Sequence, residues 1–318
     1  MRVLVTGGVG RLGVSVCNNL LKNGFQVRVF DLNNKRNRKS VGEIEGEVEV
    51  HWGDITQPAS VREALEGADA VVHMAGILPP VAYQNPELAR AVNVGGTRVL
   101  VDLLKEKGGH IPFVFTSSVA TFGPTPDATE PLAVEKDTPR PRGAYGETKL
   151  EAENLIKESG IDYLILRLTA VMYFTFGMSD MERMFSIPLN NRIEFCHQDD
   201  LALAILNAVK NFDALKGNTL VVSGGPEQRM LYKDMVGSML KIMGLPLPPD
   251  HKFTQQPYYL DWYDTSRSQE LLDFQRKTFD DYLADYEQEL TRRFSPLFLP
   301  FMRYFVSPLF GKVVVRLM

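Results

Sequence analysis

A glycine-rich stretch at residues 6–13 constrains the fold of this chain more than any other feature. It reads Thr6-Gly7-Gly8-Val9-Gly10-Arg11-Leu12-Gly13, and it lies between a β-branched run and an amphipathic segment. The first glycine of such a pattern permits a tight turn, the second lets a phosphate approach the backbone, and the third allows helix and strand to pack closely. The pattern predicts a strand–turn–helix unit whose helix start binds a dinucleotide pyrophosphate at Gly7, Gly10 and Gly13.

Strand and helix patterns alternate along the first half of the chain. Short β-branched runs predict strands at residues 2–6, 26–31, 48–52, 70–74, 113–117, 163–168 and 219–222. Apolar residues spaced three and four apart predict helices at residues 12–22, 60–66, 86–107 and 145–159. This alternation is typical of a parallel sheet covered on both faces. We therefore predict an α/β fold, a Rossmann-type doubly wound parallel sheet with a smaller C-terminal substrate-binding lobe.

The predicted domains follow from where the alternation stops. Residues 1–168 form the dinucleotide-binding domain, to which residues 197–223 return, and residues 169–196 and 224–294 form the substrate-binding lobe. The first lobe segment is rich in methionine and aromatic residues, which suit either a hydrophobic or small carbonyl substrate or ordinary core packing. These residues are Met172, Tyr173, Phe174, Phe176, Met178, Met181, Met184 and Phe185.

Composition excludes several classes of function. The chain has 35 Lys and Arg against 39 Asp and Glu, a net charge of −4, which gives no electrostatic footprint for nucleic acid. Cys17 and Cys196 lack the spacing of zinc or redox motifs, so we expect core cysteines and no metal. The first residues lack the apolar stretch of a secretory signal, and we expect a cytoplasmic protein.

The segment 295–318 differs from the rest of the chain. It is apolar, carries the three cations Arg303, Lys312 and Arg316, and contains no acid, while its prolines interrupt any stretch long enough to cross a bilayer. Two alternatives remain open for this tail. It either lies in the interfacial region of an anionic membrane as a peripheral contact, or packs on its own domain or across a dimer.

Asp31 ends the second predicted strand, 18 residues after Gly13. A carboxylate there can accept hydrogen bonds from both adenosine ribose hydroxyls, and it would repel a 2′-phosphate, so it favours NAD over NADP. Arg11 and the basic run at residues 35–39 keep NADP open, because cations could neutralise that phosphate. The same basic residues would equally suit a solvated loop.

Two further patterns supply acid–base groups. Tyr145 and Lys149 are four residues apart on a predicted helix and therefore share a face. A neighbouring ammonium stabilises a phenolate, which makes a tyrosine usable as an acid or base near neutral pH. Thr116-Ser117-Ser118 ends a predicted strand, where open α/β sheets bind ligands, so a hydroxyl there could hydrogen-bond the reacting oxygen.

With these and other motifs the chain resembles the extended short-chain dehydrogenases/reductases of the NAD-dependent epimerase/dehydratase family. The motifs run in family order over about residues 1–225, with a weaker echo at residues 264–267. They are residues 6–13, Asp31, Gly53-Asp54-Ile55, His73-Met74-Ala75-Gly76, Asn93-Val94-Gly95-Gly96-Thr97, residues 116–123, residues 145–149, Leu166-Arg167 and His197-Gln198-Asp199-Asp200-Leu201-Ala202.

The resemblance implies roles for individual residues. The catalytic residues it implies are Ser118, Tyr145, Lys149 and Asn93, with Ser118 orienting the substrate oxygen and Asn93 acting by position. His197, Asp199 and Asp200 would start a helix and pack. The cofactor-binding residues it implies are Gly7, Gly10, Arg11, Leu12 and Gly13 at the pyrophosphate, Asp31 at the adenosine ribose, Asp54 and Ile55 at the adenine, and Ala75, Gly76 and Lys149 at the nicotinamide ribose.

Departures from the family pattern narrow the range of activities that we expect for this chain. Residues 116–118 contain no carboxylate, which disfavours dehydratase activity, and the sequence after Arg167 lacks the proline and asparagine usual in sugar-nucleotide enzymes. The leading hypothesis is an NAD(P)-dependent oxidoreductase that transfers hydride between a secondary alcohol or ketone and nicotinamide, with Tyr145 as acid or base. The alternatives are a sugar epimerase with retained NAD and a non-catalytic dinucleotide-binding scaffold or sensor. The resemblance also implies a homodimer formed by the helices at residues 93–107 and 145–159.

Overall fold

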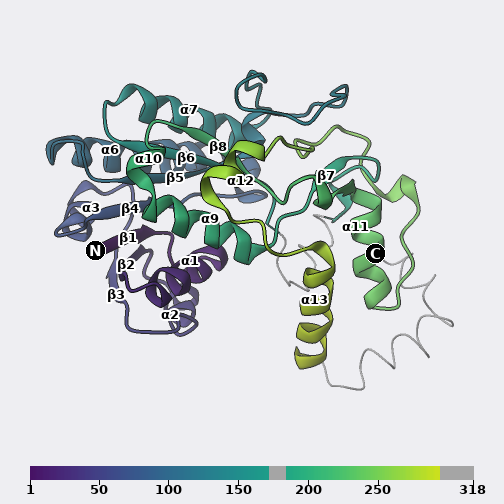
Figure 1. The fold of residues 1–318 in the computed structure, drawn as a ribbon, viewed down its shortest axis with the longest axis horizontal. Helices are drawn as coiled ribbons and strands as arrows, with labels where there is room; N and C mark the ends of the chain where they lie inside the picture. The colour runs from purple at the N-terminus through teal and green to yellow at the C-terminus, as the bar shows by residue number, and fades with distance from the viewer. Residues whose placement is uncertain (172–183, 294–318) are drawn as a thin grey trace.

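The computed structural model of this protein describes residues 1–171 and 184–293 (Figure 1). The tail 295–318, with its two predicted alternatives, lies outside the described residues. So does most of the predicted Met- and Phe-rich lining, of which Met184 and Phe185 are described. Both of these side chains pack against the core of the smaller lobe.

Seven parallel strands form the central sheet, in the order β3-β2-β1-β4-β5-β6-β8. The chain builds outward from β1 in one direction and then returns to continue on its other side, so β1 and β4 flank the point where the strand order reverses. The predicted doubly wound sheet is confirmed, with strand ends shifted by at most one residue. The strands are β1 (Arg2–Thr6), β2 (Gln26–Asp31), β3 (Glu49–Trp52), β4 (Ala70–His73), β5 (Phe113–Ser118), β6 (Tyr163–Leu168) and β8 (Thr219–Val222).

Helices cover both faces of this sheet, as Figure 1 shows. On one face α1 (Arg11–Lys22) and α9 (Gln198–Lys210) pack together and bury Val16, Leu20 and Ile205. On the other face α3 (Pro58–Leu65), α6 (Thr97–Glu106) and α7 (Ala144–Glu158) bury a second apolar layer. Since both faces are covered, the central strands carry apolar side chains on both sides.

The predicted single helix at residues 86–107 needs a correction. It contains α5 (Pro86–Arg90), a π-helical turn η1 (Ala91–Gly96) and then α6. Asn85 caps its start by accepting a hydrogen bond from Leu88 N. The spacing of apolar residues does not distinguish a π turn from an α turn. A π turn changes the backbone hydrogen bonding but leaves the order of apolar residues in the sequence unchanged. The π turn contains Asn93, one of the predicted site residues.

The basic run at residues 35–39 also needs a correction, because it is helical and not a loop. It belongs to α2 (Lys35–Val41), whose cap residue Asn34 accepts a hydrogen bond from Asn37 N at 2.9 Å. No residue of α2 is buried, so the helix has no apolar face that sequence periodicity could detect.

The smaller lobe contains a two-stranded antiparallel sheet of β7 (Arg192–Glu194) and β9 (Arg229–Leu231). The helices α11 (Tyr232–Ile242) and α13 (Phe279–Arg293) lie beside it, to the right of the main sheet in Figure 1. Within the described ranges, no helix is both long and apolar enough to cross a membrane. Short elements complete the chain: α4 (Val81–Gln84), η2 (Val119–Thr121), α10 (Phe212–Leu215), η3 (Pro226–Gln228), η4 (Asp250–Lys252) and α12 (Ser266–Leu272).

Two helical glycines give a matched test of this packing. A Cβ at Gly13 would overlap Gly7 O and lie 2.7 Å from Gly8 C, whereas a Cβ at Gly237 in α11 would meet nothing within 4 Å. We expect Gly13→Ala to lower the free energy of unfolding by roughly 1–3 kcal/mol through overpacking. Gly237→Ala should raise it by about 0.5–1 kcal/mol through helix propensity. Urea unfolding measures both, and equal effects would contradict the close approach of α1 to the glycine turn.

Candidate active site

The glycine turn leaves bare backbone at the start of α1. Gly7 has a φ of +71°, and a Cβ there would lie 2.8 Å from Ala75 N. A Cβ at Gly10 would lie 3.1 Å from Gly7 O. Arg11 is the exposed first residue of α1, while the Leu12 side chain is buried in the core, so only the Leu12 backbone can face a ligand. Uncovered N–H groups at a helix start fit a pyrophosphate.

Asp31 lies at the end of β2, beside this turn. Its Oδ2 accepts a hydrogen bond from Val9 N at 3.3 Å, and its Oδ1 accepts from Leu32 N and from Asn37 Nδ2. Burial raises the pKa of the carboxyl, while the bonds from Leu32 and Val9 oppose that shift. Oδ2 has one partner among the described residues and can therefore accept from a ribose hydroxyl as well. The carboxylate and the glycine turn together fit the nucleoside end of a dinucleotide.

The two predicted adenine residues are placed differently from each other. Asp54 is exposed, and its Oδ1 accepts hydrogen bonds from Thr56 N at 2.9 Å and Thr56 Oγ1 at 2.8 Å. The Ile55 side chain is buried, and a Cβ at Gly96 would lie 2.7 Å from its Cγ2. Asp54 therefore presents its carboxylate to solvent, whereas Ile55 helps to pack the loop after β3 against the π turn.

Lys149 is the buried cation where β4 and β5 end. Its Nζ donates to Thr116 O at 2.8 Å, lies 4.8 Å from the Phe115 ring centroid, and would lie 3.7 Å from a Cβ at Gly76. Burial lowers the pKa of this ammonium to about 8, and the nearby Glu153 carboxylate opposes the shift. Lys149 and Gly76 are therefore brought together, as their shared predicted role requires.

Tyr145 is the second residue of α7 and is buried. It packs with Ala82, Ala89 and Ala120, and Tyr259 of the smaller lobe packs against the same group. A Cβ at Gly146 would lie 2.5 Å from Ala120 O, so glycine is needed for α7 to start this close to η2. The predicted site residue Ser118 caps η2, its Oγ accepting from Ala120 N at 3.2 Å. Ala120 thus joins the neighbourhoods of Ser118 and Tyr145.

Asn93 connects the segment after β4 to α7. Its Oδ1 accepts from Ile77 N at 2.7 Å, and its Nδ2 donates to Ile77 O and to Thr148 Oγ1, both at 3.1 Å. The amide is buried and its polar atoms all have partners within the protein. Asn93 therefore fixes the backbone beside Gly76 relative to the helix that carries Tyr145.

His73 belongs to a buried hydrogen-bond chain near the site. The sequence placed His73 in a family motif but indicated no role for it. The Thr97 hydroxyl donates to Asn93 O at 2.6 Å, so its oxygen accepts from His73 Nε2 at 3.0 Å. His73 Nδ1 then accepts from the Thr6 hydroxyl at 2.7 Å, whose oxygen accepts from Ala75 N. Burial, with the charge of Lys149, lowers the pKa of His73 to about 3. A neutral imidazole therefore ties the ends of β1 and β4 to the π turn.

A buried ion pair between Glu153 and Arg167 lies near Lys149. Glu153 accepts from the Ser117 hydroxyl at 2.6 Å and pairs with Arg167, whose Nη2 lies 2.8 Å from Glu153 Oε2. Although burial disfavours its charge, the Arg167 guanidinium and the Ser117 bond leave the pKa of Glu153 below its usual value. Glu153 follows Lys149 by four residues, and that helical spacing was the sequence signal for their proximity. Ser117 thus serves this pair and is not directed at substrate.

The motif of His197, Asp199 and Asp200 starts a helix, as predicted. His197 Nδ1 accepts from Asp199 N at 3.2 Å as the N-cap of α9. Asp200 Oδ2 accepts from Arg276 N and Lys277 N, both at 3.0 Å. These residues connect α9 to the segment before α13 and do not lie among the groups around Tyr145.

Comparison with known proteins gives a consistent result. Residues 3–183 match the model of the NAD dependent epimerase/dehydratase family. The chain is 36% identical over 225 residues to an uncharacterized protein of Sinorhizobium fredii, covering 66% of this chain and 54% of that protein. It is 31% identical over 183 residues to D-erythronate dehydrogenase of Cupriavidus necator, covering 54% of this chain and 55% of the enzyme. It is 34% identical over 175 residues to UDP-glucose 4-epimerase of Lactobacillus helveticus, covering 52% and 51%.

The chain thus spans about half the length of the curated relatives it matches. Among solved structures, it resembles a short-chain dehydrogenase/reductase superfamily protein from Agrobacterium tumefaciens crystallised with bound NAD. That match has a TM-score of 0.75 and 22% identity, and covers 92% of this chain and 99% of the other. At this identity the likeness concerns the fold.

The buried ammonium of Lys149 predicts a specific pH dependence of stability. Its pKa is about 8 in the folded protein against 10.5 ordinarily, so between these values the unfolded chain binds more protons and folding becomes more favourable as pH rises. Relative to Lys149→Met, which cannot titrate there, the wild-type protein should gain about 2 kcal/mol of unfolding free energy from pH 7 to pH 9.5. Denaturant unfolding of both proteins at both pH values measures this gain. A difference that is constant or shrinks with pH would contradict the burial of the charge.

Proposed function

The chain belongs to the NAD dependent epimerase/dehydratase family, and on that premise we propose that it is an NAD-dependent oxidoreductase that interconverts a secondary alcohol and a ketone. The observation that carries this proposal is that Tyr145 and Lys149, four residues apart on α7, are both buried, with the Lys149 ammonium bonded to Thr116 O near the carboxyl end of β5. Ligands of open α/β sheets bind at this edge, where the strand order reverses. A non-catalytic scaffold would not need a buried ammonium near a buried phenol, because burying that charge costs stability.

In this mechanism the protein supplies position and proton transfer. NAD, when bound, supplies the acceptor or donor for the hydride of the carbinol carbon. The Tyr145 phenolate accepts the proton of the alcohol as the ketone forms, and returns it in the reverse direction. The Lys149 ammonium lowers the energy of that phenolate, and the Ser118 hydroxyl donates to the substrate oxygen.

The geometry around Asp31 supports NAD over NADP. Its carboxylate lies beside the glycine turn, where a 2′-phosphate would meet a like charge, and the Asn37 amide holds it there. The residue of α2 that bonds to this carboxylate is the uncharged Asn37, while the cations of α2 are exposed. The adenosine ribose hydroxyls are therefore the groups that this carboxylate would accept.

A sugar epimerase is the second candidate, favoured by the similarity to UDP-glucose 4-epimerase of Lactobacillus helveticus. Such an enzyme would oxidise a carbinol and return the hydride to the other face of the ketone, with NAD retained throughout. Dehydration remains disfavoured in this proposal. Of the hydroxyl residues 116–118, Ser117 contacts the nearest carboxylate, Glu153, and that carboxylate is already paired with Arg167.

Replacement of Tyr145 by phenylalanine tests the proposed chemistry. Tyr145→Phe should lower kcat by at least about 100-fold, since general acid–base catalysis contributes roughly that much, while the affinity for NAD stays within about twofold. Nucleotide released from the denatured wild-type protein is identified by mass spectrometry, and NAD and NADP are titrated into the apo protein. Abundant retained NAD would favour the epimerase, and reversible binding the dehydrogenase. Undiminished turnover by Tyr145→Phe would refute both.

We also propose that the protein forms a homodimer through α6 and α7. A groove between these helices is lined by Arg98, Asp102 and Lys105 of α6 and by Glu151 and Glu158 of α7. A twofold axis along the groove would place the α6 cations of one copy against the α7 carboxylates of the other. Such charge complementarity suits a self-complementary contact.

Charge reversal in the groove tests the dimer. Arg98→Glu would set like charges against each other and should raise the dimer dissociation constant at least about tenfold. Lys35→Glu on the exposed helix α2 makes the same change of charge away from the groove and should leave the dimer intact. Light scattering across a dilution series measures both. A monomeric wild-type protein at all concentrations, or equal effects of both variants, would refute this interface.

A further inference from the structure

Three tyrosines, Tyr83, Tyr258 and Tyr259, lie near Tyr145. The Tyr83 ring covers the start of α7, its Cε1 lying 3.1 Å from where a Cβ at Gly143 would be. Tyr258 and Tyr259 stack with ring centroids 4.3 Å apart and hydroxyl oxygens 3.2 Å apart. Tyr259 packs against the group that contains Tyr145, and burial with the neighbouring Tyr258 and Tyr145 phenols raises the pKa of Tyr83. Segments far apart in the sequence thus bring four phenols together.

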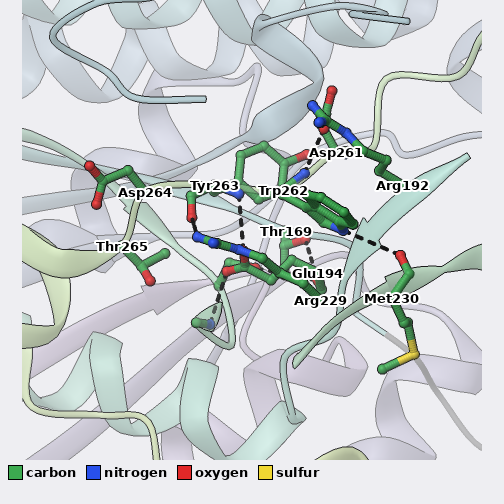
Figure 2. Close-up of polar contacts among 12 residues, drawn as sticks. Thr169, Arg192, Glu194, Arg229, Met230, Asp261, Trp262, Tyr263, Asp264 and Thr265 are labelled. Atoms are coloured by element: carbon green, nitrogen blue, oxygen red, sulfur yellow. Dashed lines mark hydrogen bonds and ion pairs between the residues drawn. The ribbon is translucent and has the colours of Figure 1, made fainter. Parts of the chain in front are cut away.

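The smaller lobe fixes the backbone that carries Tyr258 and Tyr259. Asn191 Nδ2 donates to Leu260 O at 2.9 Å, and Tyr263 N donates to Glu194 Oε2 at 3.0 Å. Figure 2 shows Glu194 beside Tyr263 and Arg229, and Arg229 is bonded both to Glu194 and to Tyr263 O. The buried Glu194 carboxylate therefore anchors this segment to the β7–β9 sheet. A pair of rings held this rigidly is preorganised for contact with a ligand.

The cations of this sheet are already paired with carboxylates. Arg229 Nε lies 3.0 Å from Glu194 Oε2, and Arg192 pairs with the buried Asp261 while its guanidinium covers the Trp262 ring at 4.8 Å. Figure 2 shows both pairs. β7 and β9 carry these two cations and no other. A diphosphate could recruit them only by breaking a buried ion pair, which is costly.

Apolar side chains are instead exposed beside Tyr83. Seven large hydrophobic residues are exposed in the part of the chain that the structure describes, and four of them lie within residues 78–88. Leu78 is 55% exposed, Val81 45% and Tyr83 41%. Asn93 fixes the start of this segment through Ile77. Exposed apolar side chains concentrated on one segment indicate a surface that contacts an apolar ligand.

We propose that Tyr83, Tyr258 and Tyr259 form the substrate-recognition wall of this enzyme, and that the wall takes an uncharged, ring-bearing apolar secondary alcohol. The inference rests on the proposed function, because Tyr145 marks the position of the reacting oxygen. Because Lys149 and Gly76 are assigned to the nicotinamide ribose and lie close together, the proposal places the carbon frame of the substrate against the tyrosine rings near Tyr145. Their faces and edges suit the flat surface of a fused aliphatic ring.

Binding to the NAD-loaded full-length protein tests the proposal without requiring turnover. The probes are decalol, a rigid bicyclic secondary alcohol, isopropanol as the small alcohol, and UDP as the charged alternative, each measured by equilibrium dialysis or calorimetry. Decalol should bind measurably and UDP should not. Tyr83→Ala and Tyr258→Ala should each weaken decalol binding about fivefold to tenfold, because each removes one aromatic contact. Neither should change the binding of isopropanol, which is too small to span the wall.

The controls separate recognition from folding. Leu247→Ala removes an apolar side chain that is 38% exposed in the smaller lobe, and it should leave decalol binding unchanged. Tyr258→Phe restores the ring without the hydroxyl and should recover the affinity that Tyr258→Ala loses. Tight binding of UDP, or decalol binding that is unaffected by both alanine variants, would overturn the proposal. Turnover retained by Tyr145→Phe would instead overturn the proposed chemistry and leave the binding result standing.

Discussion

The burial of the Lys149 ammonium is the constraint on which the rest of the site depends. Its charge is satisfied by Thr116 O at the end of β5 and supported by Glu153 one helical turn away. Such a charge is tolerated only where its partners are fixed, because an unpaired buried cation is costly. The close approach of α7 to β5 therefore sets the position of Tyr145. Gly146 leaves room for α7 to approach Ala120, and Gly76 leaves room beside the Lys149 ammonium.

Around this cation the fold separates two kinds of surface. Toward β1 and β2, bare glycine backbone and the Asp31 carboxylate present polar groups that suit the phosphate and ribose parts of a dinucleotide. Toward the smaller lobe, Tyr83, Tyr258 and Tyr259 present aromatic rings near Tyr145. Between the two lie Asn93 and His73, whose buried hydrogen bonds hold the ends of β1 and β4, the π turn and α7 in register.

In the smaller lobe, the arginines of β7 and β9 are paired with carboxylates, and these ion pairs hold the lobe together. Glu194 accepts hydrogen bonds from Gly225 N, Tyr263 N and Arg229, so one carboxylate holds three segments together. Removing it would leave the Arg229 guanidinium without its carboxylate partner, and buried pairs broken in this way are strongly destabilising. Because Arg192 and Arg229 are held in these ion pairs, they stabilise the lobe and are not available to bind an anionic ligand.

Local sequence patterns were enough to predict the seven strands, the glycine turn and the helix that carries Tyr145 and Lys149. These features arise from residues close together in the chain, where spacing and glycine chemistry act locally. The π turn that places Asn93 on Ile77 and the grouping of Tyr83, Tyr258 and Tyr259 arise only in the folded protein. Both depend on contacts between distant segments, which leave no periodic signal in the amino-acid sequence. The helical state of residues 35–39 left no signal for a different reason, because α2 is capped locally by Asn34 and buries no apolar face.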